Sequence, residues 1–135
     1  MTSWHVTIAA FYHLHAWIHD GTLPPIMPRL NFIEDGAKAN LVRDDFGIGT
    51  GGIRLPEVEV PIAMNTGVSH LPLGNRGLSE PFSPELLIML YPTHEDYVAK
   101  VTAAAQAAEA AGVIRPYRTA KYIADAEAAP IPTAG

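Results

Sequence analysis

Apolar positions in the first twenty residues follow the 3.6-residue period of a helix. One side carries Trp4, Ile8, Phe11 and Ile18, and much of the opposite side is also apolar, through Val6, Ala10, Leu14 and Trp17. We predict a helix over residues 4–19, with Ser3 as its cap and Asp20-Gly21 as its stop. A helix that is apolar nearly all round is expected to be surrounded by other structure.

Proline and turn residues interrupt this pattern after the first helix. Pro24 and Pro28 lack the amide donor that a helix needs, so residues 21–40 are expected to form a loop. Glycine and asparagine residues predict a second loop over residues 65–82.

Two short extended elements are expected between these loops. Residues 41–43 and 53–55 can pair as a hairpin across a long loop, and residues 58–62 alternate apolar and polar positions as a strand does. Pro56 and Pro61 place that strand at a sheet edge, because proline cannot donate to a strand ladder.

Three helix starts follow in the last third of the chain. Ser83 before Pro84 is a cap followed by a first-position proline, and Thr93 with Asp96 is typical of a capping box. With Pro116 as the third start, we predict helices over residues 84–90, 94–111 and 116–129.

These elements place the chain in the α+β fold class. The expected order is a helix in residues 1–20, loops and short strands in 21–82, helices in 83–129 and a tail at 130–135. A length of 135 residues fits a single domain or a domain fragment.

Composition limits the classes of partner. Apolar residues make up 48% of the chain and charged residues only 17%, so apolar surface is expected unless something covers it. The net charge of -5 and the scattered Lys and Arg residues argue against nucleic acid as a partner. The chain has no cysteine, no apolar run of the roughly 20 residues that a membrane helix needs, and no basic start typical of a secretory signal. A cytoplasmic location without a membrane span is therefore expected.

Histidines are the candidate metal ligands, because His15 and His19 lie four residues apart on one helix face and His13 is close by. No acid or further histidine is spaced as an obvious third ligand, and the metalloprotease pattern needs Glu where Ala16 stands. We therefore interpret the cluster as partly buried histidines without a metal, and we expect no cofactor. His70 lies in a predicted loop, where no partner is spaced to form a catalytic pair with it.

Residues 47–52 fit the G-x-G-x-x-G pattern of a dinucleotide loop. That pattern binds a pyrophosphate only between a strand and a helix, and the β-branched and acidic residues around Pro56 are not expected to form a helix. We interpret these glycines as turn residues.

Nucleophile motifs are missing from the sequence. None of its four serines, Ser3, Ser69, Ser79 and Ser83, lies in G-x-S-x-G. The acidic pairs Asp44-Asp45 and Glu57/Glu59 fit a turn and the solvent side of a strand. No catalytic, cofactor-binding or metal-binding residue is assigned.

Several segments, taken together, resemble one family. They are W-I-H-D-G-T-L-P-P at 17–25, G-G-I-R-L-P at 51–56, V-P-I-A at 60–63, P-F-S at 81–83, L-Y-P-T at 90–93 and D-Y-V at 96–98. In this order they resemble the C-terminal region of the alpha/beta hydrolase domain-containing proteins, and the resemblance covers nearly the whole chain.

The resemblance implies a serine hydrolase that cleaves an ester or a similar acyl bond. In that fold the nucleophile, the acid and the histidine follow one another along the chain, and the nucleophile elbow and most of the parallel sheet would lie before Met1. The catalytic histidine of the family also falls before the first helix, and His5 does not match it well enough to take that role. The resemblance therefore transfers no catalytic residue to this chain.

Three functional hypotheses follow. The first is the C-terminal segment of an alpha/beta hydrolase, inactive alone and completed by an N-terminal hydrolase portion, which another chain can supply. The second is a small non-catalytic binding or structural protein that self-associates into a homo-oligomer through its apolar first helix. The third is a small enzyme built on the histidine cluster, and it ranks last because no nucleophile accompanies it.

Overall fold

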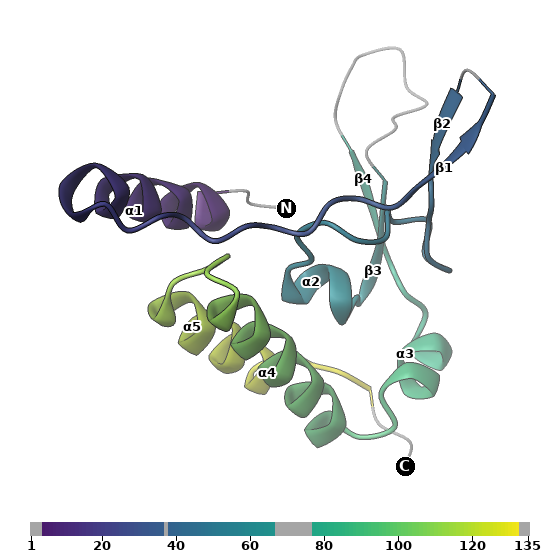
Figure 1. Ribbon diagram of the computed structural model, residues 1–135. Coiled ribbons are helices and arrows are strands. Elements are labelled where there is room, and N and C mark those ends of the chain that lie inside the picture. Colours follow the sequence, from purple (N-terminus) through teal and green to yellow (C-terminus); the bar gives the residue numbers. More distant parts are fainter. Residues whose placement is uncertain (1–3, 37, 67–76, 133–135) are drawn as a thin grey trace.

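The computed structural model describes residues 4–36, 38–66 and 77–132 (Figure 1). These residues form an α+β structure with small antiparallel strand pairs, as predicted. The helices are α1 (Trp4–Asp20), α2 (Pro56–Glu59), α3 (Pro84–Leu90), α4 (His94–Ala110) and α5 (Pro116–Glu127). The strands are β1 (Phe32–Asp35), β2 (Lys38–Leu41), β3 (Ala63–Thr66) and β4 (Leu78–Pro81).

The predicted helices α1, α3, α4 and α5 are confirmed to within two residues at each end, and two of their predicted caps are in place. Ser83 Oγ accepts a hydrogen bond from the backbone N–H of Leu86 at 3.3 Å, and Thr93 Oγ1 accepts one from Asp96 at 3.1 Å. The Asp96 carboxylate pairs with Lys100 at 2.7 Å, which is the i,i+4 pair that the spacing favours. Ser3, the predicted cap of α1, lies outside the described residues.

The main core lies where α5 packs against α4 (Figure 1). Ile114, in the turn between them, is 2% exposed, and Ala105 at the centre of α4 is fully buried. His94 Nε2 at the start of α4 donates to the Ala126 carbonyl oxygen at 3.0 Å, so it ties the start of α4 to the end of α5. Alanines on the buried side of α4 let the two helix backbones approach closely.

Residues 21–40 do not form a loop throughout, because residues 32–41 form the β1–β2 hairpin. Asp35 pairs with Lys38, so only two residues connect the strands. Gly36 has a φ of 61°, a left-handed conformation that glycine adopts easily and that tight hairpin turns require. The prediction overlooked the Asp-Gly pair at 35–36, which is a strong hairpin signal.

The prediction of a loop at residues 65–82 is also wrong at both ends, because strand residues occupy them. β3 and β4 pair antiparallel, from Ala63 opposite Pro81 to Thr66 opposite Leu78. The glycine and asparagine residues that suggested a loop lie mostly between these strands, so the segments beside them are free to pair.

The hairpin predicted between residues 41–43 and 53–55 does not form. Arg43 instead bridges Gly49, and Leu30 bridges Gly51. The physical reason is Asp44, whose carboxylate accepts the N–H groups of Phe46 at 3.0 Å and Ile48 at 2.9 Å and closes a tighter turn.

The edge strand predicted at residues 58–62 is wrong, because this segment begins in the one-turn helix α2. Pro56 occupies the first helical turn, where its fixed φ is preorganised, and the Val60 N–H donates to the Pro56 carbonyl oxygen at 2.8 Å. The alternation of Val58 and Val60 therefore reflects burial at a helix end rather than a pleated strand.

Helix α1 is the least buried of the long helices. Ala9 is its one buried residue, while Trp4, Phe11 and Ile18 are 66%, 65% and 77% exposed. Figure 1 shows α1 above the α4–α5 pair, at the opposite end of the molecule from α3. Among the described residues, no helix is long and apolar enough to cross a membrane.

The Thr93 cap gives a stability prediction. Replacing Thr93 by Ala should lower the free energy of unfolding by about 0.5–2 kcal/mol, because the Asp96 N–H loses its acceptor at the start of α4. Urea denaturation measures this change. The matched control is Thr102→Ala inside α4, which should stay within about 0.5 kcal/mol because alanine favours a helix interior. Equal effects of the two substitutions would contradict the role of the cap.

Candidate functional site

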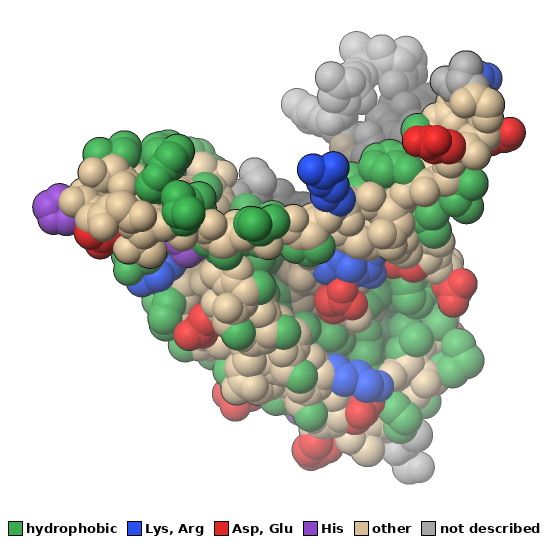
Figure 2. Space-filling view, viewed as in Figure 1, with side chains coloured by type: hydrophobic (Ala, Val, Ile, Leu, Met, Phe, Trp, Pro, Cys, Tyr) green, Lys and Arg blue, Asp and Glu red, His purple; other side chains and the backbone are tan. Residues whose placement is uncertain are grey.

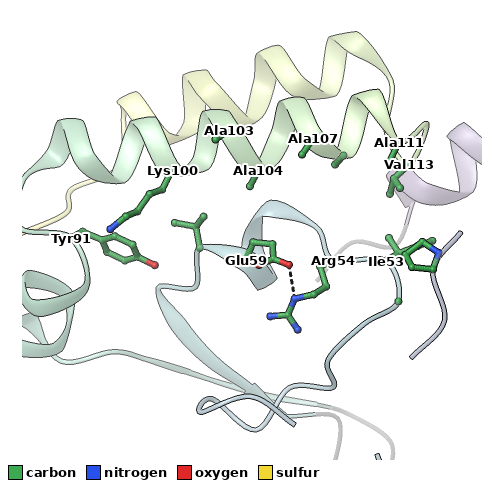
Figure 3. A pocket seen from close by; sticks show the side chains of 14 residues that line it. Ile53, Arg54, Glu59, Tyr91, Lys100, Ala103, Ala104, Ala107, Ala111 and Val113 are labelled. Atoms are coloured by element: carbon green, nitrogen blue, oxygen red, sulfur yellow. Dashed lines mark hydrogen bonds and ion pairs between the residues drawn. The ribbon is translucent and has the colours of Figure 1, made fainter. Parts of the chain in front are cut away.

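A groove of about 560 Å³ runs along α4 (Figure 3), and we call it the alanine groove. Small side chains of α4 form one wall, and the segment leading into α2 forms the other. Its lining residues are Pro28, Gly52, Ile53, Arg54, Glu59, Val60, Tyr91, Lys100, Ala103, Ala104, Ala107, Ala108, Ala111 and Val113.

Arg54 is the central polar side chain of this groove. Its guanidinium pairs with Asp44 at 2.8 Å and with Glu59 at 2.6 Å, and the second pair is drawn as the dashed line in Figure 3. The same group donates to the carbonyl oxygens of Gly49 at 2.8 Å and Val58 at 3.4 Å. Arg54 thereby joins the 44–49 turn to α2.

These contacts change the protonation of both partners. Burial by itself raises the pKa of Asp44, but the hydrogen bonds from Arg54 and from two backbone N–H groups outweigh it, so the net pKa lies below the ordinary value. Burial alone would lower the pKa of Arg54, and its hydrogen bonds to Asp44 and Glu59 reverse that, so its pKa is raised. Both groups are therefore charged at neutral pH.

Tyr91 and Lys100 line the other end of the groove. The Tyr91 hydroxyl donates to the Pro61 carbonyl oxygen at 2.8 Å, and burial, with smaller contributions from Tyr97 and Asp96, raises the pKa of Tyr91 to about 12. Lys100 Nζ donates to the Leu90 carbonyl oxygen at 2.9 Å and lies 5.2 Å from the Tyr91 ring centre. The hydroxyl is thus a protonated structural donor at neutral pH.

The polar side chains of the alanine groove are already engaged within the fold. Arg54, Tyr91 and Lys100 all make hydrogen bonds within the fold, and the rest of the lining is largely apolar.

A second polar cluster lies where α2 and α5 meet the start of α1. The Tyr122 hydroxyl donates to Glu57 Oε2 at 2.5 Å, and burial together with this carboxylate raises the pKa of Tyr122 to about 12. The Arg118 guanidinium lies 4.2 Å from the centre of the Tyr122 ring. His5 feels the charges of Arg118 and Glu57, and its buried Nδ1 has no hydrogen-bond partner.

The histidines of α1 have separate roles. His13 Nε2 donates to the Gly112 carbonyl oxygen at 2.8 Å, which anchors α1 to the end of α4. His15 and His19 stack with ring centres 5.5 Å apart on the exposed side. No group of three metal-ligating side chains occurs within the described ranges, and His70 lies outside them.

The glycines at 47–52 lie in the turn that Asp44 closes and in the two β-bridges that follow it. A helix does follow them, contrary to the prediction, but α2 begins four residues later and is one turn long. Gly51 has a φ of 71°, and a Cβ there would lie 2.5 Å from the Arg29 carbonyl oxygen. Glycine at this position therefore allows the close pairing of Leu30 with Gly51 rather than the approach of a phosphate.

The described serines lie in a helix cap and in a strand. Ser83 caps α3, and Ser79 is an exposed residue of β4. Ser3 and Ser69 lie outside the described residues. The Arg54 network and the Tyr122–Glu57 bond have no signal in the sequence. Their carboxylates fit a solvent-facing turn and strand, and no local spacing links them to their partners.

Substitution of Arg54 tests whether its ion pairs stabilise the fold. Arg54→Met keeps the aliphatic stem but removes the guanidinium, and it should lower the free energy of unfolding by about 2 kcal/mol, because Asp44 loses a charge-assisted hydrogen bond. Chemical denaturation checks this value. Arg29→Met at an exposed position should change stability by less than about 0.5 kcal/mol. An unchanged free energy of unfolding in Arg54→Met would show that the network does not stabilise the fold.

The lowered pKa of His5 leads us to expect that the protein loses stability in mild acid. Burial, helped by Arg118 and Lys121 and opposed by Glu57, lowers the pKa of His5 below 6.5. The unfolded chain then binds the proton first, so the free energy of unfolding should fall as the pH drops below about 6.5. Urea denaturation at about pH 7.5 and about pH 5.5 measures the fall. His5→Gln should reduce it, whereas His15→Gln, at an exposed position, should not; equal pH dependence in all three proteins would count against this role.

Comparison with known proteins identifies the family but no individual relative. No curated protein and no solved structure matches the chain. A family model described as an alpha/beta hydrolase domain matches residues 1–124 of the 135, which is the family that the ordered segments resemble. With its mixed helices and small strand pairs, this chain belongs to the alpha/beta hydrolase domain family.

Proposed function

We propose that these residues form a non-catalytic, C-terminal part of an esterase-like acyl hydrolase. The observation that carries the proposal is the combination of family membership with a sequence in which no serine lies in a nucleophile elbow. The described residues also contain only two-stranded antiparallel pairs, whereas the nucleophile of this fold stands on a parallel sheet. Polypeptide other than these 135 residues therefore supplies the nucleophile and its oxyanion donors.

The alanine groove supports a role in contact with that polypeptide. Ala103, Ala107 and Ala111 are exposed along it, so a partner backbone can approach α4 closely. The charged groups of the groove are already paired within the fold, and contact with an apolar partner leaves them hydrogen-bonded. In this arrangement the chain contributes shape and stability to the hydrolase, and the chemistry takes place elsewhere.

A second candidate is the self-associating binding protein. The specific observation in its favour is the exposure of the large apolar residues of α1, which an isolated monomer would leave in water. This candidate also has no hydrolase activity. The two candidates differ in the partner that covers the exposed surface, which is the rest of a hydrolase in the first and further copies of this chain in the second.

Two measurements test the proposed hydrolase role. The chain alone should neither hydrolyse p-nitrophenyl acetate nor react with a fluorophosphonate probe, because it lacks an activated serine. Mixing it with the nucleophile-bearing segment of a family hydrolase, cut where residue 1 aligns, should restore ester hydrolysis. Ala107→Glu should weaken this restoration, whereas Ala124→Glu, at an exposed position of α5 outside the groove, should not. Probe labelling of the chain alone, or no restoration at any ratio of the segments, would refute the proposal.

A further inference from the structure

Two histidines near the end of helix α1 lie on the same exposed side of the helix. His15 and His19 are four residues apart, so their side chains stand one turn from each other. Both are exposed, contrary to the expectation of partly buried histidines, and their rings stack with centres 5.5 Å apart and an interplanar angle of 26°. His13 differs from this pair, because it is bonded to the Gly112 carbonyl oxygen and belongs to the attachment of α1.

The spacing of this pair suits the binding of one metal ion by both rings. Bonds of about 2.0–2.1 Å from a tetrahedral ion to two imidazole nitrogens place those nitrogens about 3.4 Å apart. Rings whose centres lie 5.5 Å apart can reach this separation by side-chain rotation, because both side chains are exposed. Since the described residues bring no group of three ligating side chains together, water completes the coordination.

The charges at this end of α1 also favour a cation. His19 lies in the last turn, where the helix dipole is negative, and α1 contains no Lys or Arg. Asp20 follows, and its carboxylate accepts the backbone N–H of Thr22 at 3.0 Å. Figure 2 shows histidine and acidic side chains exposed together at this end of the helix. The Arg115 guanidinium lies one turn earlier, where it stacks 3.6 Å from the centre of the Tyr12 ring and does not occupy the pair.

We propose that His15 and His19 form a two-ligand site for a divalent transition-metal ion at the end of α1. Imidazole nitrogens suit Cu²⁺, Ni²⁺ and Zn²⁺, whereas Mg²⁺ prefers oxygen ligands. The ion joins two successive turns, so it binds the helical form of α1 better than an unfolded segment and stabilises the helix. The site does not depend on the proposed hydrolase role, because neither histidine lines the alanine groove.

Calorimetric titration of the untagged chain with Ni²⁺ at about pH 7.5, where unperturbed imidazoles are neutral, tests the site. One Ni²⁺ should bind per chain, and Mg²⁺ should not bind. His15→Gln and His19→Gln should each weaken Ni²⁺ binding at least about tenfold, because one of only two protein ligands is lost. Circular dichroism should show unchanged helix content, because both residues are exposed. Unweakened binding in both variants, or no binding by the unaltered chain, would overturn the proposal.

A double variant with an unchanged number of histidines tests the spacing. His15→Gln combined with Ile18→His moves the pair to adjacent positions, which do not face each other on a helix. The fold should tolerate the change, because Ile18 is 77% exposed. This variant should bind Ni²⁺ as weakly as His15→Gln does. Binding as tight as that of the unaltered chain would show that histidine content, rather than the four-residue spacing, holds the ion, and would overturn the proposal.

Hydrogen exchange tests whether the ion lies on α1. Ni²⁺ should slow the exchange of backbone amides in the last two turns of α1, because the bound ion lowers the fraction of open helix, and should leave the amides of α4 unchanged. His19→Gln should abolish this protection. Unchanged exchange in α1 while Ni²⁺ is bound, or equal slowing in α1 and α4, would overturn the assignment of the ion to this helix.

Discussion

The packing of α5 against α4 is the interaction on which the rest of the structure depends. Ile114 and the buried alanines of α4 bring the two helices close, and the remaining elements attach to this pair. Tyr122 of α5 reaches Glu57 of α2, and His13 of α1 reaches the Gly112 carbonyl oxygen between α4 and α5. Gly112 has a φ of 74°, a conformation that commonly ends a helix, and it follows the end of α4. A Cβ at this position would lie 3.0 Å from the His13 ring, so glycine also allows α1 to approach closely.

The middle of the chain adds polar contacts to the burial of Leu55, Pro56 and Val60. The strands there are short and largely exposed, and Arg54 joins the turn at Asp44 to α2. Since a hydrogen-bonded ion pair needs defined positions of both partners, this network fixes the path of the exposed turn at residues 44–49 relative to α2. The alanine groove lies beside this network, and Arg54 and Glu59 form part of its wall.

Capping residues and prolines predicted the helix ends, because these residues act on the backbone close to them. The caps Ser83 and Thr93 and the prolines Pro84 and Pro116 predicted the starts of α3, α4 and α5, because each signal acts within one helical turn. The alternation at 58–62 predicted a strand, although Pro56 could also begin a helix. The Arg54 and Tyr122 contacts join residues up to 65 positions apart, and only the packed fold brings such residues together. For the candidate site, the sequence indicated a turn at the glycines of 47–52, and the structure places Gly47 in a turn but Gly49 and Gly51 in β-bridges. The sequence did not indicate the groove.

The sparse attachment of α1 has a consequence for how the molecule fluctuates. His13 contacts the Gly112 carbonyl oxygen, Tyr12 stacks under Arg115 and Val6 packs against the core, but Ala9 is the one buried residue of the helix. Opening α1 therefore exposes little of the core, so its free energy of local opening is a small fraction of that for global unfolding. Its backbone amides then exchange with solvent deuterium much sooner than those of α4, and the helix behaves as a separately opening unit on a stable base.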